Sequence, residues 1–199
     1  MNPDRGAGRA DFEVIANWIP RNAHVLDLGC GDGALLRYLR ERRGVTGYGV
    51  EIDDDHVARC VKHGLNVVQQ NLDAGLRLFA DGMFDTVVLS QTLQAMHNVE
   101  GILREMARVA RQGIVSFPNF GHWRHAVSLL AGRMPVTKQI PYQWYDTPNI
   151  HLCTLKDFEI LTARVGLVIT GRTVLAEGRP VTLAPALRAT VAIYRFEAR

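Results

Sequence analysis

The stretch V-L-D-L-G-C-G-D-G at residues 25–33 restricts the fold of this chain more than any other feature of its sequence. Three glycines at alternate positions, Gly29, Gly31 and Gly33, follow a short apolar run and precede an amphipathic stretch at residues 34–42. Glycine permits a sharp turn and a close approach of the backbone to a ligand. The free N–H groups at the start of the next helix favour a polar ligand. The pattern therefore predicts a strand, a ligand-binding loop and a helix.

Short apolar runs alternate with amphipathic stretches along the chain, which is typical of βαβ units and a parallel sheet. The expected strands cover residues 24–28, 46–52, 65–69, 84–89, 114–117, 167–175 and 190–196. The expected helices cover residues 11–18, 34–42, 53–61, 74–79, 99–109 and 155–165, and residues 123–130 are compatible with another. We therefore predict one α/β domain over residues 1–199, with a Rossmann-like, seven-stranded, mostly parallel sheet and helices on both faces.

Two carboxylates indicate which ligand the glycine loop binds. Glu51 ends the second expected strand, where a carboxylate can accept both hydroxyls of an adenosine ribose. Asp27 lies two residues before Gly29, where it would repel a pyrophosphate but attract the sulfonium and ammonium groups of S-adenosylmethionine. This charge argument favours S-adenosylmethionine over a nicotinamide dinucleotide, although Ala34 also satisfies the dinucleotide glycine pattern. A degenerate site that keeps the fold and binds nothing is the other alternative.

Composition argues against several classes of protein. The net charge of +3 is small and the basic residues are scattered, so no nucleic-acid partner is expected. The sequence has no apolar run long enough to span a membrane, and residues 1–20 lack the apolar core of a signal peptide. Cys30, Cys60 and Cys153 are far apart and form no C-x-x-C pair, so free thiols are expected. We therefore expect a cytoplasmic protein that binds neither nucleic acid nor a membrane.

The segment at residues 118–150, an insertion after the fifth strand, differs in character from the rest. Six of the 15 aromatic residues lie between residues 117 and 145, which argues against disorder. Long irregular segments in a compact domain are usually functional. Trp123, Trp144 and Tyr145 therefore belong to the core, to a lid over the binding site, or to a surface that docks a partner. Arg124 and Arg133 lie among these aromatics and suit a docking surface.

Methyl transfer from a sulfonium needs positioning and at most a general base, with no metal. The candidate bases in and next to the insertion are His122, Tyr142, Asp146 and His151. The alternative for His122 and His151 is that they fix loops by hydrogen bonds. His122 with His125, or His151 with Cys153, lacks a third ligand at suitable spacing, so no metal site is expected.

The glycine loop and the stretch G-V-E-I-D at residues 49–53 resemble the first two motifs of class I S-adenosylmethionine-dependent methyltransferases. The resemblance implies that the loop wraps the methionine part of S-adenosylmethionine, or of its product S-adenosylhomocysteine, and that Glu51 holds the ribose. The resemblance also implies that the adenine lies after the third strand, where this chain has Asn71 and the family commonly has an aspartate. It implies that the transferred methyl group lies beside the end of the fourth strand. The cofactor-binding residues implied are Asp27, Gly29, Cys30, Gly31, Gly33, Glu51, Ile52, Asn71, Leu72, Ser90 and Gln91.

Longer stretches resemble the bacterial methionine biosynthesis protein MetW family. They are L-S-Q-T-L-Q-A at residues 89–95, S-F-P-N-F-G-H-W at 116–123, G-R-M-P at 132–135 and W-Y-D-T-P-N-I-H-L-C-T at 144–154. That family has the methyltransferase fold and is associated with homoserine O-acyltransferase, which activates homoserine early in methionine synthesis. The resemblance implies an accessory or regulatory partner of that enzyme. The alternative is an active methyltransferase on a small-molecule acceptor.

Overall fold

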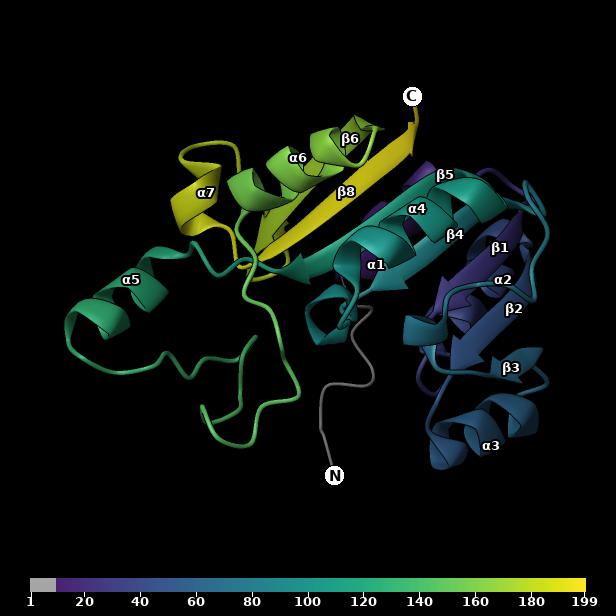
Figure 1. Cartoon of the computed structure of the whole chain (residues 1–199), viewed down its shortest axis with the longest axis horizontal. Helices are drawn as coiled ribbons and strands as arrows, with labels where there is room; N and C mark the ends of the chain where they lie inside the picture. The colour runs from purple at the N-terminus through teal and green to yellow at the C-terminus, as the bar shows by residue number, and fades with distance from the viewer. Residues whose placement is uncertain (1–9) are drawn as a thin grey trace.

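The computed structural model describes residues 10–199, and its centre is an eight-stranded sheet (Figure 1). The strands lie in the order β3-β2-β1-β4-β5-β8-β6-β7. β1 to β5 are parallel, whereas β8 is antiparallel to both β5 and β6, so the predicted mostly parallel α/β sheet is confirmed. The bounds are β1 His24–Leu28, β2 Thr46–Glu51, β3 Val67–Gln69, β4 Phe84–Ser90, β5 Ala110–Pro118, β6 Leu167–Ala176, β7 Arg179–Pro180 and β8 Val191–Ala198. The sequence predicts no signal peptide in residues 1–20, and residues 1–9 of that stretch lie outside the described residues.

The sheet has one strand more than the seven predicted. The additional strand, β7, consists of Arg179 and Pro180, which pair with the end of β6. Glu177 and Gly178 join the two strands with φ angles of 50° and 78°, and positive φ at both positions is typical of a two-residue hairpin turn. A two-residue strand has no alternating pattern that a sequence analysis could detect.

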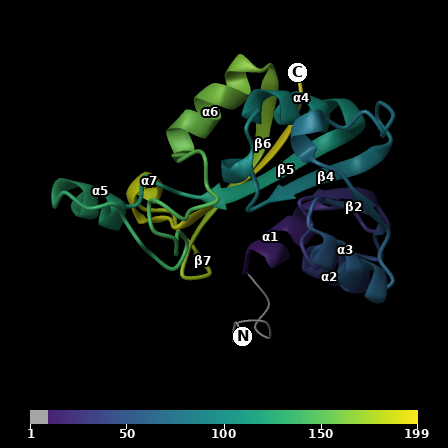
Figure 2. The ribbon, with the colours of Figure 1, turned by 60° about the horizontal axis from the view of Figure 1, so that its bottom comes forward.

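Helices cover both faces of the sheet, as predicted (Figure 1, Figure 2). Side chains of α1, α2 and α3 pack with Val25 and Val88 on one face, and those of α4 and α6 pack with Leu26 and Leu89 on the other. No helix within residues 10–199 is both long and apolar enough to cross a membrane. The bounds are α1 Ala10–Trp18, α2 Ala34–Arg43, α3 Asp54–Lys62, α4 Val99–Val109, α5 Trp123–Leu130, α6 Leu155–Arg164 and α7 Pro185–Arg188, with short 3-10 turns η1 Leu72–Ala74 and η2 Leu93–Ala95.

The prediction of a helix at residues 74–79 is wrong. The chain makes only the 3-10 turn η1, which ends at Gly75 with φ 80° and ψ −173°. The following residues make one turn-type bond, from the Phe79 N–H to the Leu76 carbonyl, and are otherwise held by side chains of α4. The Leu76 N–H donates to Glu105 Oε2, and the Arg108 guanidinium donates to the carbonyls of Leu76 and Phe79. Long-range contacts with α4 therefore override the local helical pattern.

The insertion after β5 extends away from the sheet (Figure 1, Figure 2). Its one regular element is α5, at the residues where the sequence was compatible with a helix. The rest is irregular until α6 begins at Leu155. The Phe120 N–H donates to the Cys153 carbonyl and so holds the two ends of the insertion together. The Asn119 amide donates to the Ala186 and Ala189 carbonyls and ties the start of the insertion to α7.

Candidate functional site

The glycine loop lies between the C-terminal end of β1 and the first turn of α2. The φ angles of Gly29, Gly31 and Gly33 are 65°, 56° and 77°, in the left-handed region that favours glycine. A Cβ atom at Gly29 would lie 2.7 Å from the side chain of Thr92, on the loop after β4. A Cβ atom at Gly31 would meet no described atom within 4 Å. The loop is therefore packed against the end of β4 and open at Gly31, where a ligand can approach the backbone.

Two buried carboxylates lie at the C-terminal ends of neighbouring strands. Asp27 is 2% exposed and lies in β1 in register with Gly49 of β2 and Val88 of β4. Glu51 is the last residue of β2 and is 8% exposed. Ligands of open α/β sheets bind at this end of the strands. Two acidic groups there make the crevice attractive to a cationic ligand.

The Glu51 carboxylate is fixed by three backbone N–H groups. The N–H of Gly31 donates to Oε2 at 2.7 Å, and those of Ile52 and Asp53 donate to Oε1 at 2.8 and 3.1 Å. A carboxylate has about four lone-pair sites, so these bonds leave it able to accept from a further donor such as a hydroxyl. The bond from Gly31 also links the glycine loop to the end of β2. This arrangement holds Glu51 in one orientation, as a ribose-binding carboxylate requires.

The residues expected beside an adenine lie on the β3 side of this crevice. The Ile52 side chain is 59% exposed directly after Glu51, and Leu72 is nearly buried in η1. Asn71 is the N-terminal cap of η1, because its Oδ1 accepts from the Asp73 N–H at 2.9 Å. The Asp73 carboxylate pairs with His97 Nδ1 at 2.8 Å. Burial raises the pKa of Asp73, but the hydrogen bonds from His97 outweigh that effect and leave the pKa below its ordinary value.

Ser90 and Gln91, expected beside a transferred methyl group, end β4 next to Ser116 of β5. The Ser90 and Ser116 hydroxyls are 3.1 Å apart, and the Gln91 N–H and side-chain amide both donate to Ser116 Oγ at 3.2 Å. Gln91 has a φ of 57°, which is uncommon for a residue other than glycine. The sequence analysis did not select Ser116, although a serine inside an apolar, buried strand is a signal for a polar role.

Cys30, also expected to bind the cofactor, points its side chain away from the open side of the loop. Its Sγ lies 3.8 Å from the Sγ of Cys60, and the Cys60 thiol donates to the Gly31 carbonyl at 3.2 Å. Burial is the main cause that raises the pKa of both thiols, so both are protonated at neutral pH. The two thiols therefore contact the glycine loop on its buried side. The three cysteines are free, with no disulfide among them.

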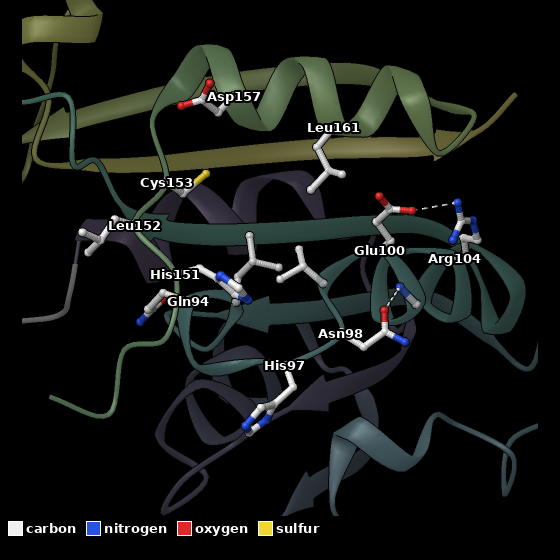
Figure 3. A pocket seen from close by; sticks show the side chains of 13 residues that line it. Gln94, His97, Asn98, Glu100, Arg104, His151, Leu152, Cys153, Asp157 and Leu161 are labelled. Carbon is white, nitrogen blue, oxygen red and sulfur yellow. Dashed lines mark hydrogen bonds and ion pairs between the residues drawn. The ribbon is translucent and has the colours of Figure 1, made fainter.

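A groove of about 540 Å³ opens next to the end of β4 (Figure 3). It lies between the first turns of α4 and α6, and residues 151–153 form its third side. Gln94, in η2, lines the groove and its amide donates to the Gln91 carbonyl at 2.7 Å. Within residues 10–199, the buried Gln94 Oε1 has no hydrogen-bond partner. A pocket of this size with an unsatisfied acceptor suits a small molecule.

The four candidate bases lie in different places. His151 lines the groove, whereas Tyr142 and Asp146 lie in the exposed part of the insertion. His122 is 8% exposed and caps α5, because its Nδ1 accepts from the Arg124 N–H at 3.2 Å. Within the described residues, no group of three or more His, Cys, Asp and Glu side chains is placed to hold a metal ion.

The cap at His122 makes α5 sensitive to acid. Burial, with the positive charges of His125 and Arg124, lowers the pKa of His122 below its ordinary value. The folded state therefore binds fewer protons than the unfolded state. The stability that His122 contributes is complete above about pH 6.5, the unfolded value, and is lost as the pH falls below it.

We expect His122→Asn to lose less free energy of unfolding than the wild type between pH 7 and pH 5. Asparagine is a good N-terminal cap and does not titrate in this range. Urea unfolding of both proteins at several pH values measures the difference. Equal losses in the two proteins would contradict the role of His122 in the pH dependence.

The sequence of this chain is similar to those of known proteins. Residues 9–196 match the family model described as "Methionine biosynthesis protein MetW". A bifunctional methionine biosynthesis protein MetXA/MetW from Rhodopirellula baltica is 37% identical over 171 residues. The match covers 80% of this chain but only 27% of that longer protein.

Solved structures share the fold at low sequence identity. An S-adenosylmethionine-dependent methyltransferase from Mesorhizobium loti is 17% identical with a TM-score of 0.71, covering 95% of this chain and 98% of the other. A SAM-dependent methyltransferase from Archaeoglobus fulgidus is 15% identical, also with a TM-score of 0.71, covering 94% and 91%. The fold predicted from the glycine loop is therefore confirmed as that of class I methyltransferases.

Proposed function

Because the chain belongs to the methionine biosynthesis protein MetW family, we propose that it binds S-adenosylmethionine or S-adenosylhomocysteine and regulates homoserine O-acyltransferase in the cytoplasm. The observation that carries the proposal is the bifunctional relative, which joins a MetW part to a MetXA part, the homoserine O-acyltransferase, in one chain. Fusion raises the effective concentration of one part at the other, which is useful when the two act together. We infer that the part described here cooperates with the acyltransferase in the same way.

Asp27 and Glu51 support the cofactor part of the proposal. Both carboxylates are buried at the ends of adjacent parallel strands. Asp27 would attract the ammonium and sulfonium groups of the cofactor, and Glu51 would accept from the ribose hydroxyls. The open side of Gly31 gives the methionine part access to the loop backbone. S-adenosylmethionine supplies an electrophilic methyl group when bound, and it is also an end product of the pathway.

A short series of contacts connects this site to the insertion. Gly29 of the glycine loop packs against Thr92, and Gln94, two residues further on, donates to the Gln91 carbonyl. The Gln94 carbonyl in turn accepts from the N–H groups of Ile150 and His151 at 2.8 and 3.0 Å. A ligand that shifts the glycine loop would thus act on the C-terminal end of the insertion. If the bound and free forms differ in affinity for the acyltransferase, the cofactor regulates the complex.

The test is the rate of acyl transfer to homoserine by the purified acyltransferase of the same organism. We expect addition of this chain to change the rate, and saturating S-adenosylmethionine to alter that change by about fivefold or more, the usual size of an allosteric coupling. A chain with Asp27→Asn and Glu51→Gln should keep the effect of the protein and lose the effect of the cofactor. An unchanged rate, together with no complex in sedimentation, would overturn the proposal.

A second candidate function, methyl transfer to a small acceptor, is favoured by the groove beside β4. Gln94 and His151 both line this groove, and His151 would be the base. Incubation with S-adenosylmethionine and a small-metabolite fraction distinguishes the two functions. Release of S-adenosylhomocysteine by the wild type, but not by a His151→Gln variant, would favour the enzyme.

A further inference from the structure

The insertion exposes a group of large apolar side chains that a folded chain normally buries. Leu130 is 89% exposed, Trp144 and Tyr145 are each 71% exposed, and Val127 is 55% exposed. Single exposed apolar residues are common on protein surfaces, but contiguous groups mark interaction sites, and Val127 and Leu130 share one face of α5 because they lie three positions apart. These exposures also exclude the core as the place of Trp144 and Tyr145.

Helix α5 is too short and too little packed to be stabilised by its own contacts. It has eight residues, of which only His125 is buried. Helices shorter than about 12–15 residues are marginal in water unless tertiary packing supports them. Among the described residues, support comes from the His122 cap and from the His125 ring, which packs against the Phe120 ring and whose nitrogens contact the Phe120 carbonyl and the Thr137 hydroxyl. The apolar face with Val127 and Leu130 is left uncovered.

The position of α5 argues against a lid. The helix and the segment after it extend away from the sheet (Figure 1, Figure 2). Of residues 118–154, only 151–153 line the groove beside β4, and the exposed aromatics do not. The exposed aromatics are therefore not part of the wall of this groove.

We propose that the exposed face of α5 together with Trp144 and Tyr145 is the surface on which this chain docks homoserine O-acyltransferase. This docking surface deepens the proposed function and rests on it. The occupant follows from the bifunctional relative, in which a MetXA part accompanies the MetW part. The docking surface also has the composition of an interface hot spot, because Trp123 carries the Arg124 guanidinium 5.5 Å above its ring.

The charge of the insertion defines the complementary face of the partner. Residues 121–152 contain three basic side chains, Arg124, Arg133 and Lys138, and one acidic side chain, Asp146. A partner face that complements it is apolar at its centre and carries carboxylates at its rim. The acyltransferase is expected to present such a patch.

The experiment compares two double variants with matched exposure. Val127→Asp with Leu130→Asp places charges on the docking surface. Val61→Asp with Leu78→Asp places them on side chains that are 63% and 68% exposed in α3 and before β4, at the other end of the molecule. We expect the first pair to weaken binding of the purified acyltransferase at least about thirtyfold, as loss of a hot spot does, and the second to change it less than about threefold.

Three outcomes decide between the alternatives. If the wild type binds the acyltransferase and both double variants bind equally well, the docking surface is wrong while the proposed function stands. If the wild type does not bind at all, the proposed function is wrong. If the wild type alone is a dimer and only the first variant is a monomer, the surface joins two copies of this chain, which overturns the proposed occupant. Circular dichroism and S-adenosylmethionine titration of each variant show that the fold is kept.

Discussion

Asp27→Asn and Glu51→Gln are each expected to weaken the binding of S-adenosylmethionine at least about tenfold, and the double variant to abolish it. Each substitution keeps the side-chain shape and removes a charge, and a hydrogen bond to a charged group contributes about 1.5–3 kcal/mol. Glu51→Gln has a further cost, because its new NH₂ group would face one of the three backbone N–H groups that the carboxylate accepts from. Calorimetric titration measures both affinities.

The matched control for these variants is Glu41→Gln. Glu41 is an exposed carboxylate near the C-terminal end of α2, remote from the glycine loop at the start of that helix. Its loss changes the net charge by the same amount, so it reports the effect of overall charge alone. We expect no more than a twofold change in affinity, which is the scale of a screened surface charge. If Asp27→Asn binds the cofactor as tightly as Glu41→Gln does, the charge argument for this site is wrong.

The sheet was predictable because its strands carry their signal locally. β4 reads F-D-T-V-V-L-S, and an apolar run of this length between turn residues indicates burial on both faces. The glycine loop was predictable for a similar reason, since the positive φ angles of Gly29, Gly31 and Gly33 favour glycine. The helix expected at residues 74–79 failed because its backbone groups bond to side chains of α4, which lie far along the chain.

The candidate site could be predicted only for those residues whose role follows from one short segment of the sequence. Asp27 and Glu51 follow from strand ends, but the bonds between Gln91 and Ser116 join two strands that are 25 positions apart in sequence. The contact of Gln94 with Ile150 spans a still longer separation. Composition also could not decide whether Trp144 is buried, because an aromatic side chain serves a core and an interface equally well.

Gly47→Ala is expected to lower the free energy of unfolding by about 3–5 kcal/mol, a large part of the about 5–15 kcal/mol available to a domain. Gly47 has a φ of 147°, and a Cβ atom there would lie 1.8 Å from the carbonyl oxygen of Val25 in β1. Strain at such a φ costs about 1–3 kcal/mol, and displacing a packed backbone costs a similar amount. Because β2 ends in Glu51, a displaced strand would also move the carboxylate that we propose binds the ribose.

Gly64→Ala separates the two causes, because Gly64 has a φ of 64° and a Cβ atom there would meet nothing within 4 Å in the described part of the chain. It should show the cost of positive φ alone, about 1–2 kcal/mol. Urea unfolding followed by circular dichroism measures both variants. Equal losses would mean that the close approach of β2 to β1 adds nothing, whereas a loss at Gly47 above about 3 kcal/mol, the upper cost of a strained φ, would show that this approach requires glycine. The position of Glu51 then depends on a residue four positions earlier in the same strand.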